Sequence, residues 1–314
     1  MTANQSLNRK LLSLFLSVLF LAVGWFLFRS EWHQLEKLHW HQAPWLIAAI
    51  LVRWLRTALR CRLQQSIIRN DGVRIPYLEM LSLGFATTLT NGVLPLKSGS
   101  ALSAVFLKKR YHYSFQSYVG VILGVNVLFT LIALIIGCLA ASALWFLGST
   151  PNPNLGIITL ALIFLLVGAI ALLGYGKKIK QLPPKIHRIL SGWTELWQKK
   201  EVWRPATSIA IISTALSALS LALAFKAFGI RLDLLGTALL MCSQNLGNLI
   251  SLTPGSFGFK EAFGAYFATT LGITSAQTVF VLLIFRLSGL LSYLLPGLVS
   301  FFSLSRKLKD PSAR

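Results

Sequence analysis

The chain of 314 residues is 55% hydrophobic and only 12% charged, which is about half the charged fraction of a soluble domain. Its 30 Lys and Arg residues outnumber nine Asp and Glu residues, giving a formal net charge of +21. Apolar runs recur from residue 11 to residue 302, which excludes a soluble globular protein and favours a polytopic helical membrane protein. Because the basic residues lie mostly beside apolar runs, they indicate membrane topology and headgroup contact, and no nucleic-acid partner is expected.

The apolar runs predict one integral membrane domain over residues 1–314, all-α, with about six full spans. The first span is about 27 Å long as a helix and no cleavage site follows it, so we expect it to be retained. The predicted segments, in chain order, are a first span at 10–28, a repeat unit at 44–146, a linking span at 155–173, a basic interfacial loop at 177–204, a second repeat unit at 203–302 and a basic tail at 303–314.

The sequence indicates no metal or cofactor site. Its cysteines, Cys61, Cys138 and Cys242, lie in or beside apolar segments without CxxC spacing, so we expect them to pack as small apolar residues. A loop after the first span holds three histidines among three tryptophans: His33, His39, His41, Trp32, Trp40 and Trp45. Tryptophans at this position are typical of the membrane–water interface, and we favour that interpretation over metal binding.

Each repeat unit contains an apolar segment that is interrupted by Gly and Pro, at residues 77–110 and 234–271. The second interruption places Pro254, Gly255, Gly258, Lys260 and Glu261 within eight residues. Broken backbone and charged side chains are both costly in hydrocarbon, so such segments must be enclosed by protein. We expect both segments to be re-entrant helical hairpins.

The distribution of basic residues predicts the topology. With both termini in the cytoplasm, the cytoplasmic side holds almost all of the Lys and Arg residues outside the spans, as expected for a plasma membrane protein, here the bacterial inner membrane. This placement requires the two hairpins to enter from opposite sides. The chain would then contain an inverted repeat, and paired interrupted segments of this kind indicate a transporter's midplane site.

Candidate substrate-binding residues are the polar, Gly and Pro residues of these segments and of the neighbouring spans: Arg53, Asn91, Pro95, Lys97, Gly99, Asn126, Asn245, Asn248, Pro254, Gly255, Gly258, Lys260, Glu261 and Arg286. Basic side chains and helix N-termini can replace the water that a phosphate headgroup loses inside the membrane. No catalytic residue is expected.

Four of the charged side chains carry more specific expectations. Arg53 lies too deep in its span to reach the headgroups, so we expect it to face the protein interior, whereas Arg56 and Arg60 could extend to the near surface. Glu261 is expected to balance Lys260 or Arg286, or to take up a proton during transport. A Glu261–Arg286 pair that only fixes helix packing is the alternative.

Two motifs carry a family resemblance: Asn91-x3-Pro95-x-Lys97-x-Gly99 and Pro254-Gly255-x2-Gly258-x-Lys260-Glu261. They resemble the lysylphosphatidylglycerol synthase transmembrane region family, which includes the flippase domain of the bacterial multiple peptide resistance factor. The resemblance implies membrane helices with re-entrant hairpins and movement of lipids between leaflets, here as a stand-alone membrane domain without the soluble aminoacyl-transferase domain.

The chain also departs from the family pattern at three positions. Ser100 and Ser103 stand where many members carry an acidic and then a basic residue, and Ser256 stands where Gly is common. The headgroup preference of relatives is therefore not transferred to this chain.

We expect a lipid flippase or scramblase, or a transporter of a lipid-linked anion. One alternative is a membrane-embedded lipid-modifying transferase, although the sequence shows no paired carboxylates and no nucleophile beside a base. The other is a non-catalytic anchor for a lipid or envelope synthase, with residues 177–204 as the docking surface. The lipid, the direction of transport, its energy coupling, a synthase partner and a homo-oligomer are left open by the sequence.

Overall fold

The computed structural model describes residues 42–94, 98–147, 153–175, 200–249 and 254–309. This part of the chain contains nine α-helices, one short 3₁₀ helix and no strand, which confirms the all-α prediction. The expected first span at 10–28 lies outside the described residues, and so does most of the basic loop at 177–204.

The helices follow the order predicted from the apolar runs. In chain order they are α3 (Ala43–Asn70), α4 (Tyr77–Val93), α5 (Ser98–Tyr111), α6 (Phe115–Leu147), α7 (Pro153–Tyr175), α9 (Lys200–Ala227), α10 (Leu234–Leu249), η4 (Pro254–Ser256), α11 (Phe259–Thr269) and α12 (Ser275–Lys309). Within the described ranges, α6, α7, α9 and α12 are long and apolar enough to cross a membrane.

Three helix boundaries differ from the expected ones. Helix α12 continues to Lys309, seven residues beyond the expected end at 302, so the first part of the expected basic tail at 303–314 is helical. Helix α3 continues to Asn70, ten residues beyond the expected end near Arg60, because Leu63 and Ile67 extend its buried face at i, i+4 spacing. Helix α9 begins at Lys200, so the last part of the expected loop at 177–204 is helical.

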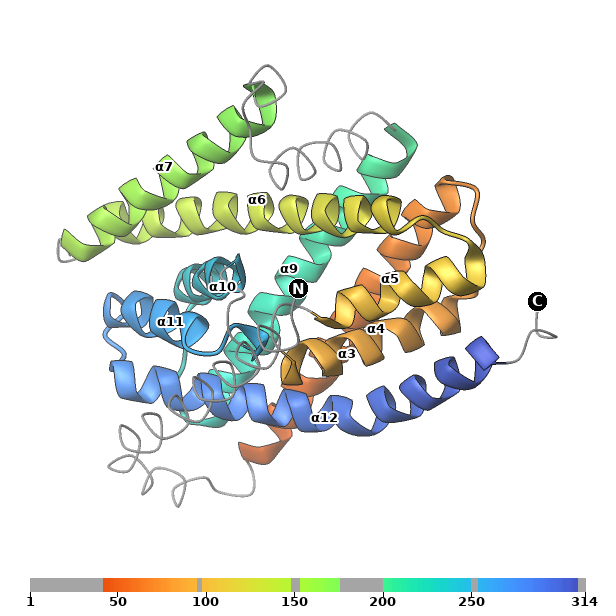
Figure 1. The fold of residues 1–314 in the computed structure, drawn as a ribbon. Helices are drawn as coiled ribbons and strands as arrows, with labels where there is room; N and C mark the ends of the chain where they lie inside the picture. Colours follow the sequence, from red (N-terminus) through yellow and green to blue (C-terminus); the bar gives the residue numbers. More distant parts are fainter. Residues whose placement is uncertain (1–41, 95–97, 148–152, 176–199, 250–253, 310–314) are drawn as a thin grey trace, which may run out of the picture.

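The two interrupted segments each form a pair of helices, and the pairs occupy opposite ends of the molecule (Figure 1). Helices α4 and α5 lie in the right half of the view, and α10 and α11 lie in the left half. Helices α6 and α12 run along most of the length above and below them, while α3 and α9 cross the molecule and pack on each other. Each pair of short helices therefore turns back near the centre of the fold.

The contacts between helices are repeated in the two halves. Helix α4 packs on α12, and in the other half α10 packs on α6; α5 contacts α6 as α11 contacts α12. The two halves correspond helix by helix: α3 with α9, α4 with α10, α5 with α11 and α6 with α12. When each helix is replaced by its counterpart, each of these contacts becomes another observed contact, and the α3–α9 contact stays the same. Helix α7 packs on α6 and lies outside this pattern.

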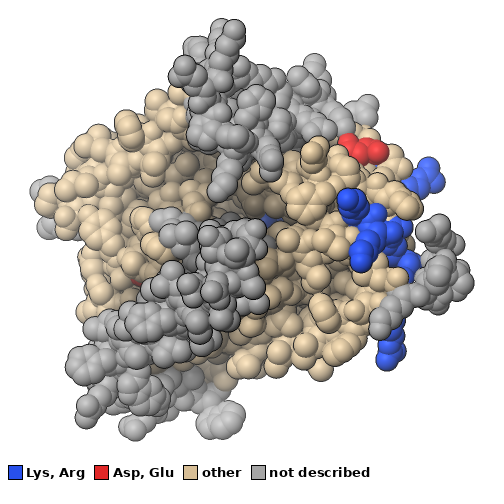
Figure 2. All heavy atoms as spheres, in the orientation of Figure 1, with Lys and Arg blue, Asp and Glu red and all other residues tan. Residues whose placement is uncertain are grey.

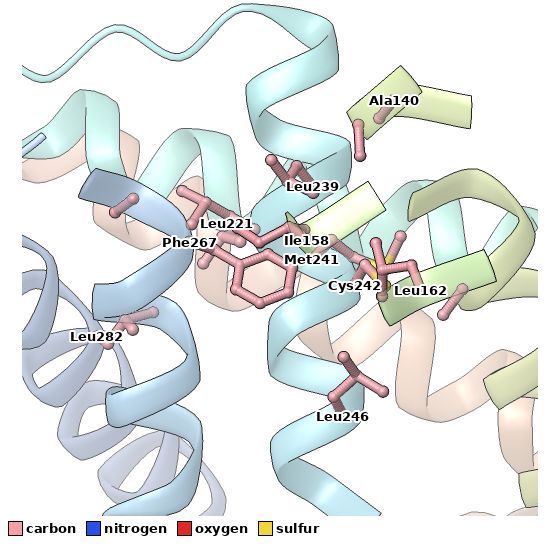
Figure 3. Packing of buried hydrophobic residues seen from close by; sticks show 14 of the residues in the cluster. Ala140, Ile158, Leu162, Leu221, Leu239, Met241, Cys242, Leu246, Phe267 and Leu282 are labelled. Atoms are coloured by element: carbon pink, nitrogen blue, oxygen red, sulfur yellow. The ribbon is translucent and has the colours of Figure 1, made fainter. Parts of the chain in front are cut away.

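The largest apolar cluster joins α6 and α7 to the second half of the chain (Figure 3). Cys242 of α10 is fully buried in this cluster, and a Cβ added to Gly137 of α6 would collide with its Sγ atom. Gly137 thus permits the close approach of α6 and α10. Cys61, Cys138 and Cys242 are buried and free, as expected for packing residues.

Candidate functional site

A cavity of about 350 Å³ lies where the turning points of the two helix pairs meet α3, α6 and α12. The end of α4 and the start of α5 line it from one side, and the end of α10, Gly255 and Ser256, and the start of α11 line it from the other. Five basic side chains contribute to the wall: Arg53, Arg56, Arg60, Lys260 and Arg286. None of the carboxylates in the described ranges lines it. The cavity is therefore basic and suited to an anion.

The α4–α5 turn is closed by the first family motif. The side-chain oxygen of Asn91 accepts a hydrogen bond from the backbone N–H of Gly99 at 2.9 Å. A Cβ atom on Gly99 would lie 2.5 Å from the carbonyl oxygen of Thr87, so only Gly fits this close approach. Gly99 is thus a structural residue of the turn, whereas Asn91 also lines the cavity.

The turn before α11 depends on residues with positive φ. Gly255 has φ +57° and Gly258 has φ +88°, and the non-glycine residue Ser256 has φ +60°. The backbone N–H of Gly258 donates a hydrogen bond to Oε2 of Glu261 at 2.8 Å, which satisfies an N–H group at the start of α11. The left-handed backbone at Ser256 is a conformation that glycine adopts at less steric cost than serine.

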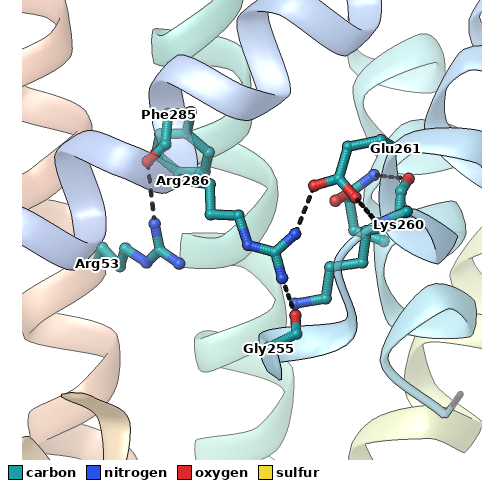
Figure 4. Close-up of polar contacts among 8 residues, drawn as sticks. Arg53, Gly255, Lys260, Glu261, Phe285 and Arg286 are labelled. Atoms are coloured by element: carbon teal, nitrogen blue, oxygen red, sulfur yellow. Dashed lines mark hydrogen bonds and ion pairs between the residues drawn. The ribbon is translucent and has the colours of Figure 1, made fainter. Parts of the chain in front are cut away.

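Glu261 and Arg286 form a buried ion pair between α11 and α12 (Figure 4). Arg286 Nη1 lies 2.5 Å from Glu261 Oε1, and the two side chains are only 13% and 4% exposed. Arg286 also donates a hydrogen bond to the carbonyl oxygen of Gly255 and lies over the ring of Phe257 at 3.8 Å. The expectation that Glu261 balances Arg286 is confirmed. Glu261 lies behind the cavity wall, while Arg286 reaches it.

Helix α3 contributes three arginines on one face, because Arg53, Arg56 and Arg60 are spaced at i, i+3 and i+7. Arg53 donates a hydrogen bond to the carbonyl oxygen of Phe285 at 3.2 Å and lies over its ring, so it faces the interior as predicted. The expectation that Arg56 and Arg60 extend to the headgroups is wrong, since both line the cavity. Packing of α3 against α9, α4 and α12 turns this face inward.

The three arginines of α3 differ in how they are held. Arg60 donates a hydrogen bond to the side-chain oxygen of Asn126 at 3.1 Å and lies over the ring of Phe129. The side chain of Arg56 makes no hydrogen bond or ion pair with any described residue. Its five N–H donors are therefore available to a ligand.

Lys260 adds a fourth cation from the opposite wall. Its side chain extends beside Gly255, close to the guanidinium of Arg286 (Figure 4), and it lies within electrostatic range of Arg53 and Arg56. A Cβ on Gly247 of α10 would lie 2.7 Å from the Cα atom of Lys260. The missing side chain at Gly247 thus allows the start of α11 to pack directly on α10.

The predicted site residues separate into three groups. Those that line the cavity are Arg53, Asn91, Asn126, Asn245, Asn248, Gly255, Lys260 and Arg286. Gly99, Gly258 and Glu261 shape the turns behind it, and Pro254 begins η4. Pro95 and Lys97 lie outside the described residues. In the described ranges, no group of three or more His, Cys, Asp and Glu residues is placed to hold a metal ion.

Sequence reasoning missed several lining residues besides Arg56 and Arg60. Thr57, Thr87, Ser100, Ser103 and Tyr293 supply hydroxyl groups to the wall. The Arg56 and Arg60 positions carried a usable signal, the shared helical face with Arg53. Ser100 and Ser103 stood out in the sequence only as departures from the family pattern. Thr57 and Thr87 carried no signal, because Thr is common in membrane helices and bonds to its own backbone.

The fold and the cavity together define an all-α membrane protein with a basic site between its helices. The family model for the lysylphosphatidylglycerol synthase TM region matches residues 10–297. The chain belongs to this family, which makes it an integral membrane protein from a family related to lipid handling. Searches of curated proteins and of solved structures gave no match.

Proposed function

We propose that this protein is a flippase, scramblase or transporter that moves an anionic phospholipid or a lipid-linked anion between leaflets. The observation that carries the proposal is the basic cavity where the turns of the two helix pairs meet. Membership of a lipid-handling family supports a lipid as the transported molecule. In this proposal no covalent bond changes, so the protein is a transporter and not an enzyme.

The cavity has the chemistry to replace the hydration of a phosphate headgroup. Arginine forks and amide groups supply the hydrogen bonds that water would otherwise make. Helices α5 and α11 both begin at the cavity, since Ser100 and Lys260 lie in their first turns and line it. The partial positive charges of the two helix N-termini add to the attraction for an anion. The volume of about 350 Å³ lies within the range of small-ligand sites.

We propose that α4–α5 and α10–α11 are re-entrant hairpins that enter from opposite sides of the membrane, within about six spans. The exchange symmetry of the helix contacts supports two related halves. In such transporters, discontinuous elements from both halves meet at a midplane substrate site.

The basic end of the molecule supports cytoplasmic termini in a bacterial inner membrane. Figure 2 shows Lys and Arg side chains gathered at the end where α5 and α12 finish. Those in the last turns of these helices or close to them are Lys108, Lys109, Arg110, Arg306 and Lys307. By the positive-inside rule, these basic residues support a cytoplasmic location for this end.

Leaflet exchange of a fluorescent phospholipid in proteoliposomes tests the proposal. The protein should accelerate exchange of an anionic reporter, and Arg56→Gln should slow it at least about tenfold, a change of roughly 1.4 kcal/mol in barrier height. Arg62→Gln is the matched control, because Arg62 lies on the same helix, is exposed and does not line the cavity. Exchange at the protein-free rate for every anionic phospholipid and lipid-linked sugar tested would contradict the proposal.

A further inference from the structure

We infer that the cavity selects a headgroup with at least two negative charges, such as a terminal phosphomonoester or a diphosphate, over zwitterionic headgroups and singly charged phosphodiesters. The inference rests on the proposed function in that the phosphate is carried by a lipid. It concerns binding in the cavity, however, and is tested separately from transport.

The first step is the balance of charge in the wall. Five cations line the cavity and no described carboxylate does. Glu261 neutralises Arg286 from behind the wall. The acceptors of Arg53 and Arg60 are the neutral carbonyl of Phe285 and the neutral amide of Asn126, which fix these side chains without cancelling their charge. Four positive charges therefore remain without a counter-charge from the described residues: Arg53, Arg56, Arg60 and Lys260.

The second step compares this charge with that of candidate headgroups. Like charges that share an enclosed site repel strongly, and a bound anion relieves the repulsion in proportion to its own charge. A phosphodiester contributes one negative charge, whereas a phosphomonoester carries about −1.5 to −2 at pH 7 because its second pKa is near 6. A diphosphate carries more. The charge of the four cations that lack a counter-charge is thus better matched by a terminal phosphate than by a phosphodiester.

The third step is the arrangement of hydrogen-bond donors. Two of these cations lie on opposite walls, Arg56 on α3 and Lys260 on α11. Neither side chain donates a hydrogen bond to a described residue, so the N–H donors of both are available to a ligand. A terminal phosphate presents three oxygens that can accept from separate donors, while a phosphodiester has two of its four oxygens in ester bonds. Donors on opposite walls therefore favour the group with more free oxygens.

The same chemistry could come from a lipid or from a soluble phosphate ester. Apolar side chains also line the cavity, including Leu89, Leu249 and Leu290, and Leu249 is 57% exposed at the end of α10. An apolar surface beside the cations suits the glycerol and acyl part of a lipid. We therefore assign the phosphate to a lipid headgroup and include the soluble source in the test.

The experiment measures binding of fluorescent lipids to the full chain in nanodiscs of phosphatidylcholine at physiological salt. Phosphatidic acid carries the phosphomonoester, phosphatidylglycerol the singly charged phosphodiester and labelled phosphatidylcholine the zwitterion. Phosphatidic acid should bind at least about tenfold more tightly than either of the others. Equal affinity for the three lipids, or a preference for phosphatidylglycerol, would overturn the inference.

Two substitutions test whether the charge of the wall causes the preference for phosphatidic acid. Each lowers the charge of the wall by one. Arg56→Gln removes a cation, and Ser100→Asp adds an anion at a position that lines the cavity. Each should reduce the preference for phosphatidic acid over phosphatidylglycerol several-fold. Arg62→Gln, which removes a cation from the same helix as Arg56 outside the cavity, should keep the preference. Thermal unfolding shows whether the Arg56→Gln and Ser100→Asp proteins are folded. An unchanged preference in the folded variants would overturn the inference that charge selects the headgroup.

Competition with glycerol phosphate distinguishes the two sources. It carries the same phosphomonoester without acyl chains, so it should displace phosphatidic acid only at much higher concentration; displacement at equal concentration would assign the site to a soluble ester and overturn the lipid assignment.

Failure of the proposed function gives a different result from failure of the charge inference. Selective binding of phosphatidic acid without leaflet exchange would refute transport alone, and leaflet exchange without selectivity would refute the charge inference alone.

Discussion

The charged residues of the cavity divide into those that hold the fold and those that face the ligand. Glu261 and Arg286 are paired at 2.5 Å and buried, so either one alone would be an uncompensated charge in the interior. Arg56 has no such partner among the described residues. Substitutions at the two kinds of position should therefore separate effects on stability from effects on binding.

Glu261→Gln should lower the free energy of unfolding by about 3 kcal/mol, because it leaves the buried guanidinium of Arg286 without its counter-charge. Chemical unfolding of the purified protein in mild detergent measures the change. The double variant Glu261→Gln/Arg286→Gln should recover part of the loss, since it removes both charges together. Additive losses in the double variant would show that the two residues do not stabilise each other.

Ser256→Gly should raise the free energy of unfolding by about 1 kcal/mol, because glycine lacks the Cβ atom that makes the backbone at φ +60° strained. The same unfolding measurement checks it. Ser288→Gly is the control, since Ser288 lies inside α12, where Gly costs about 1 kcal/mol relative to Ala. A loss of stability in Ser256→Gly would indicate that the buried hydroxyl outweighs the backbone strain.

At the scale of elements, the site depends on how closely the paired helices pack at their turns. Helix α10 contacts the backbone at the start of α11 through Gly247, and α5 contacts α4 through Gly99. These contacts position Lys260 on one wall and the N-terminus of α5 on the other. The helix pairs thus act as rigid supports for a cavity that neither could form alone.

Gly247→Ala should destabilise the protein by about 1–3 kcal/mol, because the new Cβ would lie 2.7 Å from backbone atoms of Lys260 and α11 must shift. The shift should also slow leaflet exchange. Gly168→Ala is the matched control, since nothing lies within 4 Å of a Cβ at that exposed position of α7. Thermal unfolding and lipid exchange of both variants check this, and equal behaviour of the two would contradict it.

At the scale of the whole molecule, the basic end is held together by a buried carboxylate. Glu79 of α4 lies 2.9 Å from Nε of Arg110 and 3.5 Å from Nζ of Lys307, and it accepts a hydrogen bond from Tyr111 at 2.7 Å. This cluster joins the start of α4 to the ends of α5 and α12. The three helix ends therefore lie together at one end of the molecule.

Cysteine labelling in intact cells checks the proposed orientation. In a variant without the three buried cysteines, Lys109→Cys at the end of α5 should react only after the cytoplasmic side is opened. Ser275→Cys, at the exposed start of α12, should react with an impermeant reagent from outside. Because α12 spans between the two ends, labelling of both positions from the same side would contradict the topology.

The all-α class, the order of the helices and the two places where the backbone breaks could be predicted from the sequence. These features follow from local rules: apolar runs long enough to span, and Pro and Gly where the chain must turn. The sequence also pointed to Arg53, Lys260 and Arg286, because isolated charges in apolar segments require an enclosed environment.

Which of these residues share a cavity became known from the packing of the helices. Arg56 and Arg60 face Lys260 and Arg286 across some 200 residues of sequence, and Glu261 turns away from the cavity to cap α11 and hold Arg286. No local pattern contains this information, because the direction of a side chain in a helix is set by what packs on each face. The physical reason is that the wall consists of helix faces and turns brought together by long-range packing.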